Sequence, residues 1–352
     1  MDQAGDFSES LRLLRESAAA IVPRGDLRRI RDLRFTDRGF DRAHWQRICD
    51  LGWPALALPE SEGGSGLGMR GFAVLAEELG AGLVPEPLIP VAMAARALTG
   101  VPLANLLAGR SIVIPAWQER PNSLSLAADT IFSAGRLTGQ KVFVPMAGGA
   151  DLFLVSAREG LAILARDAPG ATLTLERTQD GGTFGTLSLD RAPATLVPGD
   201  FARPLEEAIL ATAAYLLGLS RSAFAITLDY MATRAQFGRP IAAFQALRHR
   251  VADLKIQWEL MRASIRAAAA TLDRETNLAL GRAAVSRAKA RAADASLLIT
   301  RQAIQLHGGI GYTDEADIGL FLRKAMVQIN LYGSAALHRS RYAVLAPEEQ
   351  DA

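Results

Sequence analysis

The stretch after Pro204 carries the pattern that most restricts the fold of this chain. It consists of long segments rich in Ala, Leu and Arg, in which apolar residues recur at the spacing of one helix face. We expect four helices there, over about 205–235, 242–273, 278–306 and 316–345. Because helices of this length with short connections bury their apolar faces by packing side by side, the pattern predicts an antiparallel four-helix bundle.

Two zones of different texture precede these helices. Residues 1–110 show helical periodicity, with Phe72 and Leu79 among the apolar residues of one face. Between 111 and 200, short apolar runs such as Leu152–Ser156 are separated by Gly, Pro, Asn and Asp, which is typical of strands and tight turns. We therefore expect an α+β multidomain protein with an N-terminal α-helical domain (1–110), a small middle β-barrel or β-sandwich domain (111–200) and a C-terminal four-helix-bundle domain (201–352).

Composition argues against several classes of protein. Lys and Arg number 39 against 37 Asp and Glu, so the net charge is only +2, and the basic stripe of a nucleic-acid-binding protein is missing from the sequence. The single Cys49 excludes an intrachain disulfide and a multi-cysteine metal site. We expect no metal site, because the histidines do not have the spacing of metal ligands. They are His44, His249, His307 and His338.

The sequence predicts a soluble, cytoplasmic protein. Its start, from Met1 to Ser10, contains acidic residues and no apolar segment of a signal peptide. The longest apolar run, Ala208–Leu219, is much shorter than the ~20 residues that a membrane span needs. We expect this run to be part of a buried core helix.

Gly66-Leu67-Gly68-Met69-Arg70-Gly71 matches the glycine pattern of dinucleotide-binding folds. Such a motif should follow a strand directly, but Pro59–Gly64 separates it from the preceding apolar run. We therefore interpret it as a glycine-rich loop between helices, with a nicotinamide-cofactor site as a remote alternative.

Two motifs near the ends of expected helices are more informative. The first is Arg234-Ala235-Gln236-Phe237-Gly238-Arg239-Pro240-Ile241, and the second is Gln305-Leu306-His307-Gly308-Gly309-Ile310-Gly311-Tyr312. Taken alone, each can be a helix end, since Gly238 and Pro240 suit the end of a helix. Glycines also allow a backbone to approach a ligand closely.

Together the two motifs resemble the acyl-CoA dehydrogenase family, and the likeness runs over nearly the whole chain. Further matches include Glu77-Glu78-Leu79-Gly80 and Gly139 with Lys141. The resemblance implies FAD as the cofactor and the oxidation of a fatty or steroid-side-chain acyl-CoA to its 2,3-enoyl thioester. In that reaction a carboxylate removes the α-proton while the β-hydrogen leaves as hydride to the flavin. It also implies an acceptor of the electron-transfer-flavoprotein type.

In the family, FAD lies at a subunit interface, and the resemblance assigns several residues of this chain to the FAD of a neighbouring subunit. An arginine suits a pyrophosphate because it offers planar, charge-assisted donors. The matching residues are Arg234, Gln236, Phe237, Gln305, Gly308 and Gly309.

The position of the family's catalytic base is altered. Many members carry a glutamate immediately before a Gly-Thr pair, and the corresponding residues here are Tyr332-Gly333-Ser334. Tyr332 therefore occupies the base position, and the resemblance places Ser334 beside the cofactor. A phenol with a pKa near ~10 is protonated at neutral pH, so Tyr332 is expected to be inactive as a base.

A minority of the family carries its glutamate on the helix that leads into the first motif. That position is Ala208 here, and Glu207 is its neighbour. One helical step rotates a side chain by ~100°, so Glu207 should point elsewhere. Glu207 is a candidate displaced base, and the alternative is that it complements the dipole in the first turn of a helix.

The strand expected to face the flavin departs from the family as well. Lys141-Val142-Phe143-Val144-Pro145 lies where the family has an aromatic and a hydroxyl residue. Phe143 keeps the aromatic character and is counted with the cofactor-binding residues, whereas Pro145 cannot donate a hydrogen bond.

The altered residues belong to the chain's own active site, and the retained residues serve a neighbour's FAD. We therefore expect a non-catalytic subunit of a heteromeric, α2β2 acyl-CoA dehydrogenase that pairs with a homologous catalytic subunit and acts on a bulky acyl-CoA. The alternatives are a competent homotetramer that uses Glu207 and a structural subunit without FAD.

Overall fold

The computed structural model describes residues 3–22 and 25–346. Their contacts divide the chain into two compact units, each assembled from segments that are distant in the sequence. Unit 1 comprises Met1–Arg28, Met69–Val84 and Ile209–Ala352 as far as these are described, and unit 2 comprises Arg29–Gly68 and Pro85–Ala208.

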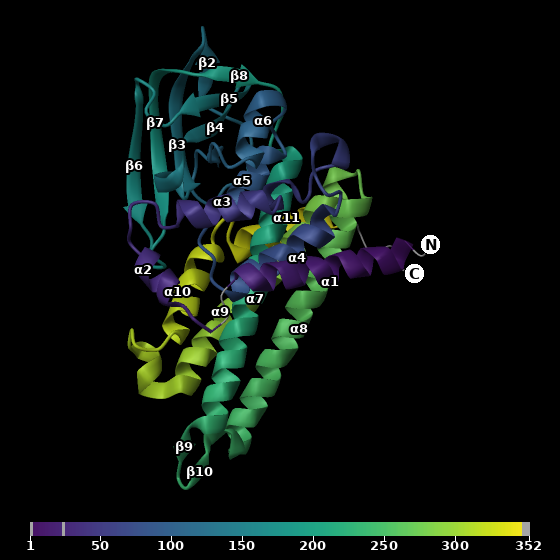
Figure 1. Ribbon diagram of the computed structural model, residues 1–352, viewed down its shortest axis with the longest axis vertical. Helices are drawn as coiled ribbons and strands as arrows, with labels where there is room; N and C mark the ends of the chain where they lie inside the picture. Colours follow the sequence, from purple (N-terminus) through teal and green to yellow (C-terminus); the bar gives the residue numbers. More distant parts are fainter. Residues whose placement is uncertain (1–2, 23–24, 347–352) are drawn as a thin grey trace. The chain divides into compact units, whose positions relative to one another are not determined.

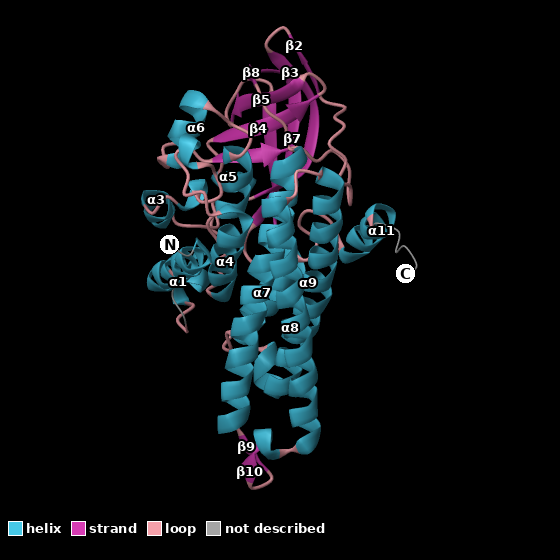
Figure 2. Ribbon diagram, turned by 90° about the vertical axis from the view of Figure 1, so that its right-hand side faces the viewer, coloured by secondary structure: helices cyan, strands magenta, loops and turns pink. Residues whose placement is uncertain are grey.

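Unit 1 is built from long helices. The helices that contribute to it are α1 (Gln3–Ile21), α4 (Gly68–Ala81), α7 (Ala202–Thr233), α8 (Gln245–Arg274), α9 (Leu278–His307), α10 (Ile318–Gln328) and α11 (Ala335–Leu345). Helices α7, α8 and α9 run side by side (Figures 1 and 2). Met231, Leu254, Ile299 and Leu306 form a buried apolar cluster among these three helices.

Helices α4 and α7 of unit 1 approach each other closely enough for their backbones to touch. A Cβ atom on Gly80 would lie 1.9 Å from the carbonyl oxygen of Tyr215, and one on Gly218 would lie 1.7 Å from that of Glu77. These distances leave no room for any side chain, so the crossing requires glycine at both positions. Arg221 of α7 adds an ion pair of 2.5 Å with the Glu77 carboxylate.

By length and composition, helix α7 could cross a membrane. However, 72% of its most apolar stretch of 18 residues is buried inside the protein. All residues of the run Ala208–Leu219 are buried. This burial is what we expect of a core helix, as the sequence predicts.

The fourth expected helix, 316–345, is in fact two helices, so the expectation of one continuous helix was wrong. Helix α10 ends at Gln328 and α11 begins at Ala335. Between them, Tyr332 and Gly333 have φ angles of 57° and 105°, which a right-handed helix does not contain. Ser334 then caps α11 by accepting a hydrogen bond from the Leu337 amide.

Unit 2 contains short helices and two sheets. Its elements include α2 (Arg28–Leu33), α3 (Arg42–Asp50), α5 (Leu88–Ala95), α6 (Gly100–Leu107), β1 (Val113–Ala116), β2 (Ile131–Ser133), β3 (Arg136–Pro145), β4 (Leu152–Ala157), β5 (Gly160–Ala165), β6 (Ala171–Arg177), β7 (Thr183–Pro193) and β8 (Thr195–Val197). The two four-stranded sheets have the strand orders β1-β4-β5-β8 and β2-β3-β7-β6. Only the β1–β4 pair is parallel among the described strands.

Strand β4 provides much of the core of unit 2. Phe153, Leu154 and Val155 are fully buried, and these consecutive residues point to opposite faces of the sheet. A strand that is covered on both faces has an uninterrupted apolar run, which explains why the sequence signal there is strong.

The expected fold class is confirmed, because along the chain a helical N-terminal region is followed by a middle region of β-sheet and then by a helical C-terminal region. The division into three domains at 110 and 200 stays a prediction. Only Gly66 and Leu67 of the glycine motif lie in the loop before α4, and residues 68–71 form the first turn of that helix, so the expectation of a loop over the whole motif was wrong. Among the described residues no strand precedes the motif.

Candidate functional site

The first motif forms a small hairpin at one end of unit 1 (Figure 1). Strand β9 (Ala235–Gln236) pairs with β10 (Arg239–Pro240) in antiparallel register. Phe237 and Gly238 form the two-residue turn, with φ angles of 54° and 79°. Such a turn needs positive φ at both central positions and matches the twist of a hairpin. Since α7 ends at Thr233, the interpretation of Gly238 as the glycine that terminates this helix was wrong.

The hairpin presents an aromatic group to solvent. The Phe237 residue is 91% exposed, although its ring contacts the Phe244 ring edge-on at 6.2 Å. The Arg239 guanidinium lies 4.3 Å from the centre of the Phe244 ring. The Gln236 side chain is exposed and donates to the carbonyl of Ala235. This surface combines aromatic and cationic groups.

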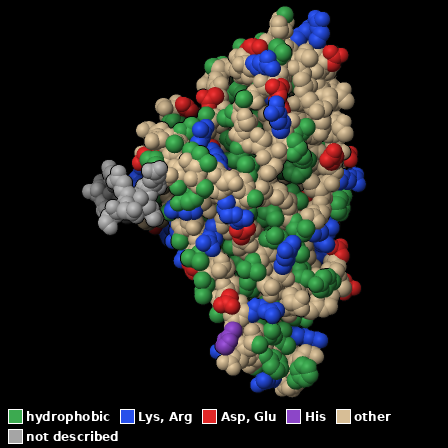
Figure 3. Space-filling view, turned by 180° about the vertical axis from the view of Figure 1, so that it is seen from behind, with side chains coloured by type: hydrophobic (Ala, Val, Ile, Leu, Met, Phe, Trp, Pro, Cys, Tyr) green, Lys and Arg blue, Asp and Glu red, His purple; other side chains and the backbone are tan. Residues whose placement is uncertain are grey.

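The same end of unit 1 is basic. Figure 3 shows Lys or Arg and His side chains beside hydrophobic ones over this end of the molecule. Four arginines there are exposed and form no ion pair with the rest of the described chain: Arg234, Arg239, Arg248 and Arg250. Unpaired arginines beside an exposed aromatic ring suit an anionic, aromatic ligand.

The second motif forms the end of α9 and the 3₁₀ turn Gly308–Tyr312. Gln305 is exposed on the last turn of α9. A Cβ atom on Gly308 or Gly309 would meet no atom within 4 Å, so open space lies next to this backbone. Tyr312 is 78% exposed at the end of the turn. The motif therefore offers accessible backbone and a polar side chain to a ligand.

Tyr230 brings the two motifs together. Its ring stacks on that of His307, with centroids 4.4 Å apart and the planes inclined by 18°. Its hydroxyl donates a hydrogen bond of 3.1 Å to the His307 carbonyl, and its own carbonyl accepts from the Arg234 amide. Tyr230 was not among the residues predicted from the sequence, although its place one helical turn before Arg234 was a usable signal.

Tyr332 lies in the segment between α10 and α11. The residue is 4% exposed, and its hydroxyl has no hydrogen-bond partner within the described parts of the chain. Burial raises the pKa of Tyr332 far above that of a free phenol. The side chain at the expected base position is therefore a neutral phenol that accepts protons poorly.

Two buried side chains hold the backbone of this segment. The ammonium group of Lys289 in α9 donates to the carbonyls of Gln328 and Ile329, at 3.1 and 2.8 Å, and lies 3.5 Å from that of Gly333. Since carbonyls only accept, Nε2 of His338 donates to the carbonyl of Tyr332 at 2.9 Å. Burial lowers the pKa of Lys289 to about 7.

Phe143 lies at an irregularity of β3 in unit 2. The pairing of β3 with β7 shifts register between Lys141 and Val144, and Phe143 has a φ angle of 53°. Its side chain is 43% exposed and contacts the ring of Phe184 edge-on at 6.3 Å. Bulges of this kind often re-aim a side chain beside a functional site.

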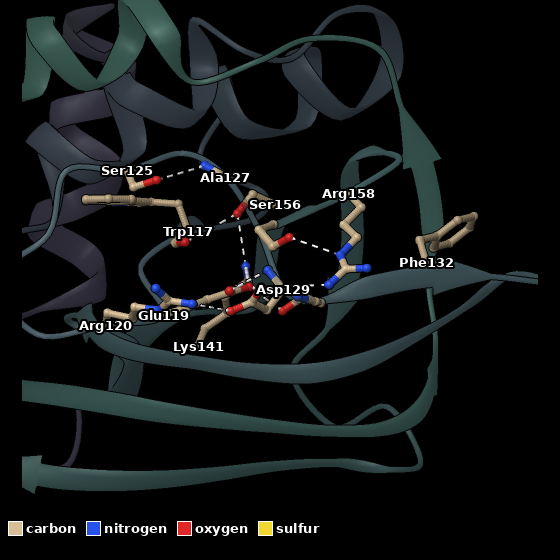
Figure 4. A network of polar contacts seen from close by, with 12 residues as sticks. Trp117, Glu119, Arg120, Ser125, Ala127, Asp129, Phe132, Lys141, Ser156 and Arg158 are labelled. Atoms are coloured by element: carbon tan, nitrogen blue, oxygen red, sulfur yellow. Dashed lines mark hydrogen bonds and ion pairs between the residues drawn. The ribbon is translucent and has the colours of Figure 1, made fainter.

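A buried ion pair anchors the loop that precedes β2 (Figure 4). The Lys141 ammonium lies 2.5 Å from Glu119 and donates to the Ser156 hydroxyl at 3.0 Å. Glu119 also accepts from the amides of Asp129 and Thr130 and from the Thr130 hydroxyl. Burial disfavours the charge of Glu119, but Lys141 and these donors outweigh it and lower its pKa to about 2.

Glu207 lies in the first turns of α7, within unit 2. Arg96 donates to its Oε2 atom at 2.9 Å, and Arg203 to its Oε1 atom at 3.0 Å. The neighbouring position, Ala208, is buried. Both carboxylate oxygens of Glu207 are thus engaged by arginines.

Two family models match this chain. The family model described as "Acyl-CoA dehydrogenase, N-terminal domain" matches residues 8–104, and "Acyl-CoA dehydrogenase, C-terminal domain" matches residues 202–344. The acyl-CoA dehydrogenase IpdE2 of Mycolicibacterium smegmatis is 32% identical over 93% of this chain and 96% of its own.

Solved structures give the same result. The Tcur3481-Tcur3483 steroid ACAD G363A variant superimposes with a TM-score of 0.85 and 31% identity over 96% of this chain and 98% of its own. The ChsE4-ChsE5 complex from Mycobacterium tuberculosis has a TM-score of 0.84 and 24% identity, over 98% of this chain and 97% of its own. At that identity the second likeness concerns the fold alone.

Proposed function

This chain belongs to the acyl-CoA dehydrogenase family of oxidoreductases, and from that premise we propose that it is a non-catalytic subunit of a heteromeric acyl-CoA dehydrogenase. In this proposal it completes the FAD site of a homologous catalytic subunit in an α2β2 assembly. The observation that carries the proposal is the burial of the Tyr332 phenol, at the position that the resemblance assigns to the family's glutamate.

Proton removal from the α-carbon of an acyl-CoA needs a base that is ionised at neutral pH. Burial raises the pKa of Tyr332 and so keeps its phenol neutral. The side chain also lies in a segment whose backbone is fixed by Lys289 and His338, so it has no simple route to another position. A chain built in this way binds and positions ligands but supplies no base.

The residues offered to a partner's FAD fit that group. Arg234 is exposed and forms no ion pair within the described chain, so its guanidinium is available to a pyrophosphate. The exposed Phe237 ring and the open space beside Gly308 and Gly309 suit a planar ligand and its phosphates. When bound, FAD supplies the hydride acceptor. Arg234, Gln236 and Gln305 of this chain would hold and orient it, and Phe237 would shield it from water.

The alternative base is Glu207, and its contacts favour a structural role. Arg96 and Arg203 each donate a hydrogen bond to this carboxylate, which holds it between two arginines of its own chain. Glu207→Gln is the variant that separates the two readings. Loss of turnover in the purified single chain with this substitution would favour a competent homotetramer. The second alternative, a structural subunit without FAD, predicts that the complex is colourless.

The names of the relatives suggest the substrate. One similar structure is described as a steroid ACAD, and we extend this to a bulky, steroid-type acyl-CoA for the assembly that contains this chain. The proposal includes a cytoplasmic location and an electron acceptor of the electron-transfer-flavoprotein type.

Co-expression tests the proposal. The chain is purified alone and together with each acyl-CoA dehydrogenase paralogue of the source genome that has glutamate at the position of Tyr332. We expect the chain alone to lack flavin absorbance and activity, and one mixed complex to be yellow, active and loaded with half as many FAD molecules as chains. An FAD-loaded assembly of this chain alone that oxidises acyl-CoA contradicts the proposal. A mixed complex that keeps its FAD after Arg234→Ala contradicts the role of the hairpin.

A further inference from the structure

Unit 1 contains a pocket that neither of the two motifs uses. Helices α1 and α4 lie side by side (Figures 1 and 2), and together with α7 and α8 they enclose a volume of about 460 Å³. We call this cavity the α1 pocket. Small-molecule sites typically have volumes of ~300–1,000 Å³, so the α1 pocket is large enough for a ligand. Neither the hairpin 235–240 nor the glycines 308–309 line it.

The buried side chains that line the α1 pocket are apolar, apart from one carboxylate. The apolar ones come from α4, α7 and α8, and each is at most 8% exposed: Ala73, Leu217, Ile265 and Ala269. Phe7 of α1 also lines the pocket, and the Arg70 guanidinium lies 4.0 Å from the centre of its ring. These surfaces favour a ligand with an apolar body, because contact with them removes apolar area from water.

Four arginines line the α1 pocket, and three of them are already paired within the chain. The fourth is Arg266 of α8, which is exposed and forms no ion pair with the part of the chain that the structure describes. The three pairings are those of Arg12 with Glu9 and Glu16, Arg15 with Glu78, and Arg70 with Asp273.

The buried carboxylate is Glu77, and its charge is balanced from behind. Arg221 of α7 lies 2.5 Å from the Glu77 carboxylate and 2.9 Å from that of Glu78, which Arg15 also contacts at 3.2 Å. Two carboxylates thus face two guanidinium groups, and the charge of Arg266 is left without a close counter-charge. A guanidinium in this state suits a carboxylate, to which it can donate two parallel hydrogen bonds.

The balance of charge also limits the ligand to one negative charge. Glu77 interacts electrostatically with Arg266, so the two groups lie near each other. A monoanion neutralises Arg266, whereas the second charge of a phosphate dianion would be repelled by Glu77. The apolar lining further disfavours a small hydrated ion, because such an ion loses water there and gains no polar partner beyond Arg266.

We propose that the α1 pocket binds an amphipathic monocarboxylate, with its apolar body against Ala73 and Ile265 and its carboxylate on Arg266. A medium-chain carboxylic acid has this chemistry. A ligand in the pocket contacts α1, α4 and α8 together, so it also fastens the N-terminal helix to the other helices of unit 1. The proposal goes beyond the proposed function and does not depend on it.

Titration calorimetry of the purified full chain tests the class of ligand. We expect octanoate to bind at least about tenfold more tightly than butanoate, because each buried CH₂ group adds to apolar binding. Octanamide has the same apolar body without the charge and should bind at least about tenfold more weakly than octanoate. Equal binding of octanamide, or tighter binding of octylamine, contradicts the proposal, since Arg266 would then not be the recognising group.

Two variants locate the site. Arg266→Gln removes the unpaired guanidinium, and the matched control is Arg287→Gln in α9, at another exposed arginine without an ion pair in the described chain. Both are surface changes, so each protein should melt within about 2 °C of the unaltered chain. We expect Arg266→Gln to weaken octanoate binding by at least about tenfold and Arg287→Gln to leave it unchanged.

Ala73→Leu is the second variant, which fills the pocket from its buried side and should also weaken octanoate binding. If octanoate binds Arg266→Gln and Ala73→Leu as tightly as the unaltered chain, its site lies elsewhere and the proposal is overturned. Absence of octanoate binding to the unaltered chain at millimolar concentration overturns it as well. None of these measurements involves FAD or a catalytic partner, so a negative result leaves the proposed function unaffected.

Discussion

The ring of Tyr230 at the end of α7 stacks on the ring of His307 at the end of α9, and the Tyr230 hydroxyl donates to the His307 carbonyl. This contact fixes the distance between the Arg234 hairpin and the glycines after α9. We expect Tyr230→Ala to lower the FAD content of the mixed complex, because in the proposed assembly both motifs face the ligand together. Tyr230→Phe, which keeps the stacking, should retain most of it. Flavin absorbance per complex measures the effect, and equal loss in both variants would show that stacking is not what aligns the motifs.

Tyr332→Phe should leave the turnover of the mixed complex unchanged. The Tyr332 hydroxyl is buried without a hydrogen-bond partner among the described residues, and an unsatisfied buried polar group costs ~1–3 kcal/mol. Its removal should therefore raise the free energy of unfolding by about 1 kcal/mol. Denaturant unfolding and steady-state kinetics measure the two quantities. A fall in turnover of tenfold or more would show that the hydroxyl takes part in the reaction.

Breaking the pair between Lys141 and Glu119 should destabilise unit 2. Glu119→Gln leaves the fully buried Lys141 ammonium without its counter-charge, which typically costs ~3–5 kcal/mol. The double variant Glu119→Gln with Lys141→Met should lose less than the two single variants added together. Urea denaturation of the four proteins gives this coupling. Additive losses would mean that the pair contributes no specific interaction.

His338 should make the protein sensitive to acid. Burial, and the neighbouring Lys289 charge, lower the pKa of His338 to about 3, so the folded protein binds fewer protons than the unfolded chain below pH 6.5. Stability should consequently fall as the pH drops from about 6.5 towards 3, by up to ~1.4 kcal/mol per pH unit from this group. His338→Gln does not titrate there and should flatten the curve. Identical slopes for both proteins between pH 6 and 4 would refute this.

Gly218→Ala should prevent α4 and α7 from packing normally. The added Cβ would lie 1.7 Å from the Glu77 carbonyl oxygen, so the helices must separate, and we expect a loss of at least ~3 kcal/mol. Gly281→Ala in α9 is the control, because its Cβ meets only the flexible end of Leu272 at 3.0 Å. This second change should be close to neutral, since the helix propensity of alanine offsets the tight contact. Thermal unfolding of the two variants tests the contrast.

The helices of unit 1 could be predicted because their apolar spacing is regular over many turns. Strong strands such as β4 could be predicted for a similar reason, since burial on both faces produces an uninterrupted apolar run. Strand β6 has a weaker sequence signal although Leu173 and Leu175 alternate with polar residues, because most of the strand is exposed and rich in threonine and charged residues. The sequence of β5, from Gly160 to Ala165, does not distinguish a strand from a short buried helix.

The motifs around Arg234 and Gln305 were identified by their resemblance to a family. The buried side chains that hold the 329–334 segment were not predicted. Lys289 and His338 lie in apolar helical patterns, and nothing local indicates that their polar atoms turn inward to the 329–334 segment. The hairpin at Phe237 was missed because glycine followed by proline after a helix has the same local signature as a simple helix end. Such features depend on contacts between residues that are distant in the sequence.

The support that Lys289 and His338 give to the segment between α10 and α11 acts on carbonyl groups, not on the side chain of residue 332. The path of the main chain there is therefore independent of which side chain it displays. A carboxylate can be exchanged for a phenol without rearrangement of the surrounding helices. A chain can therefore lose a base at this position and keep its fold. In a family with that property, a substitution at one position can produce a subunit that has no base of its own and serves another subunit.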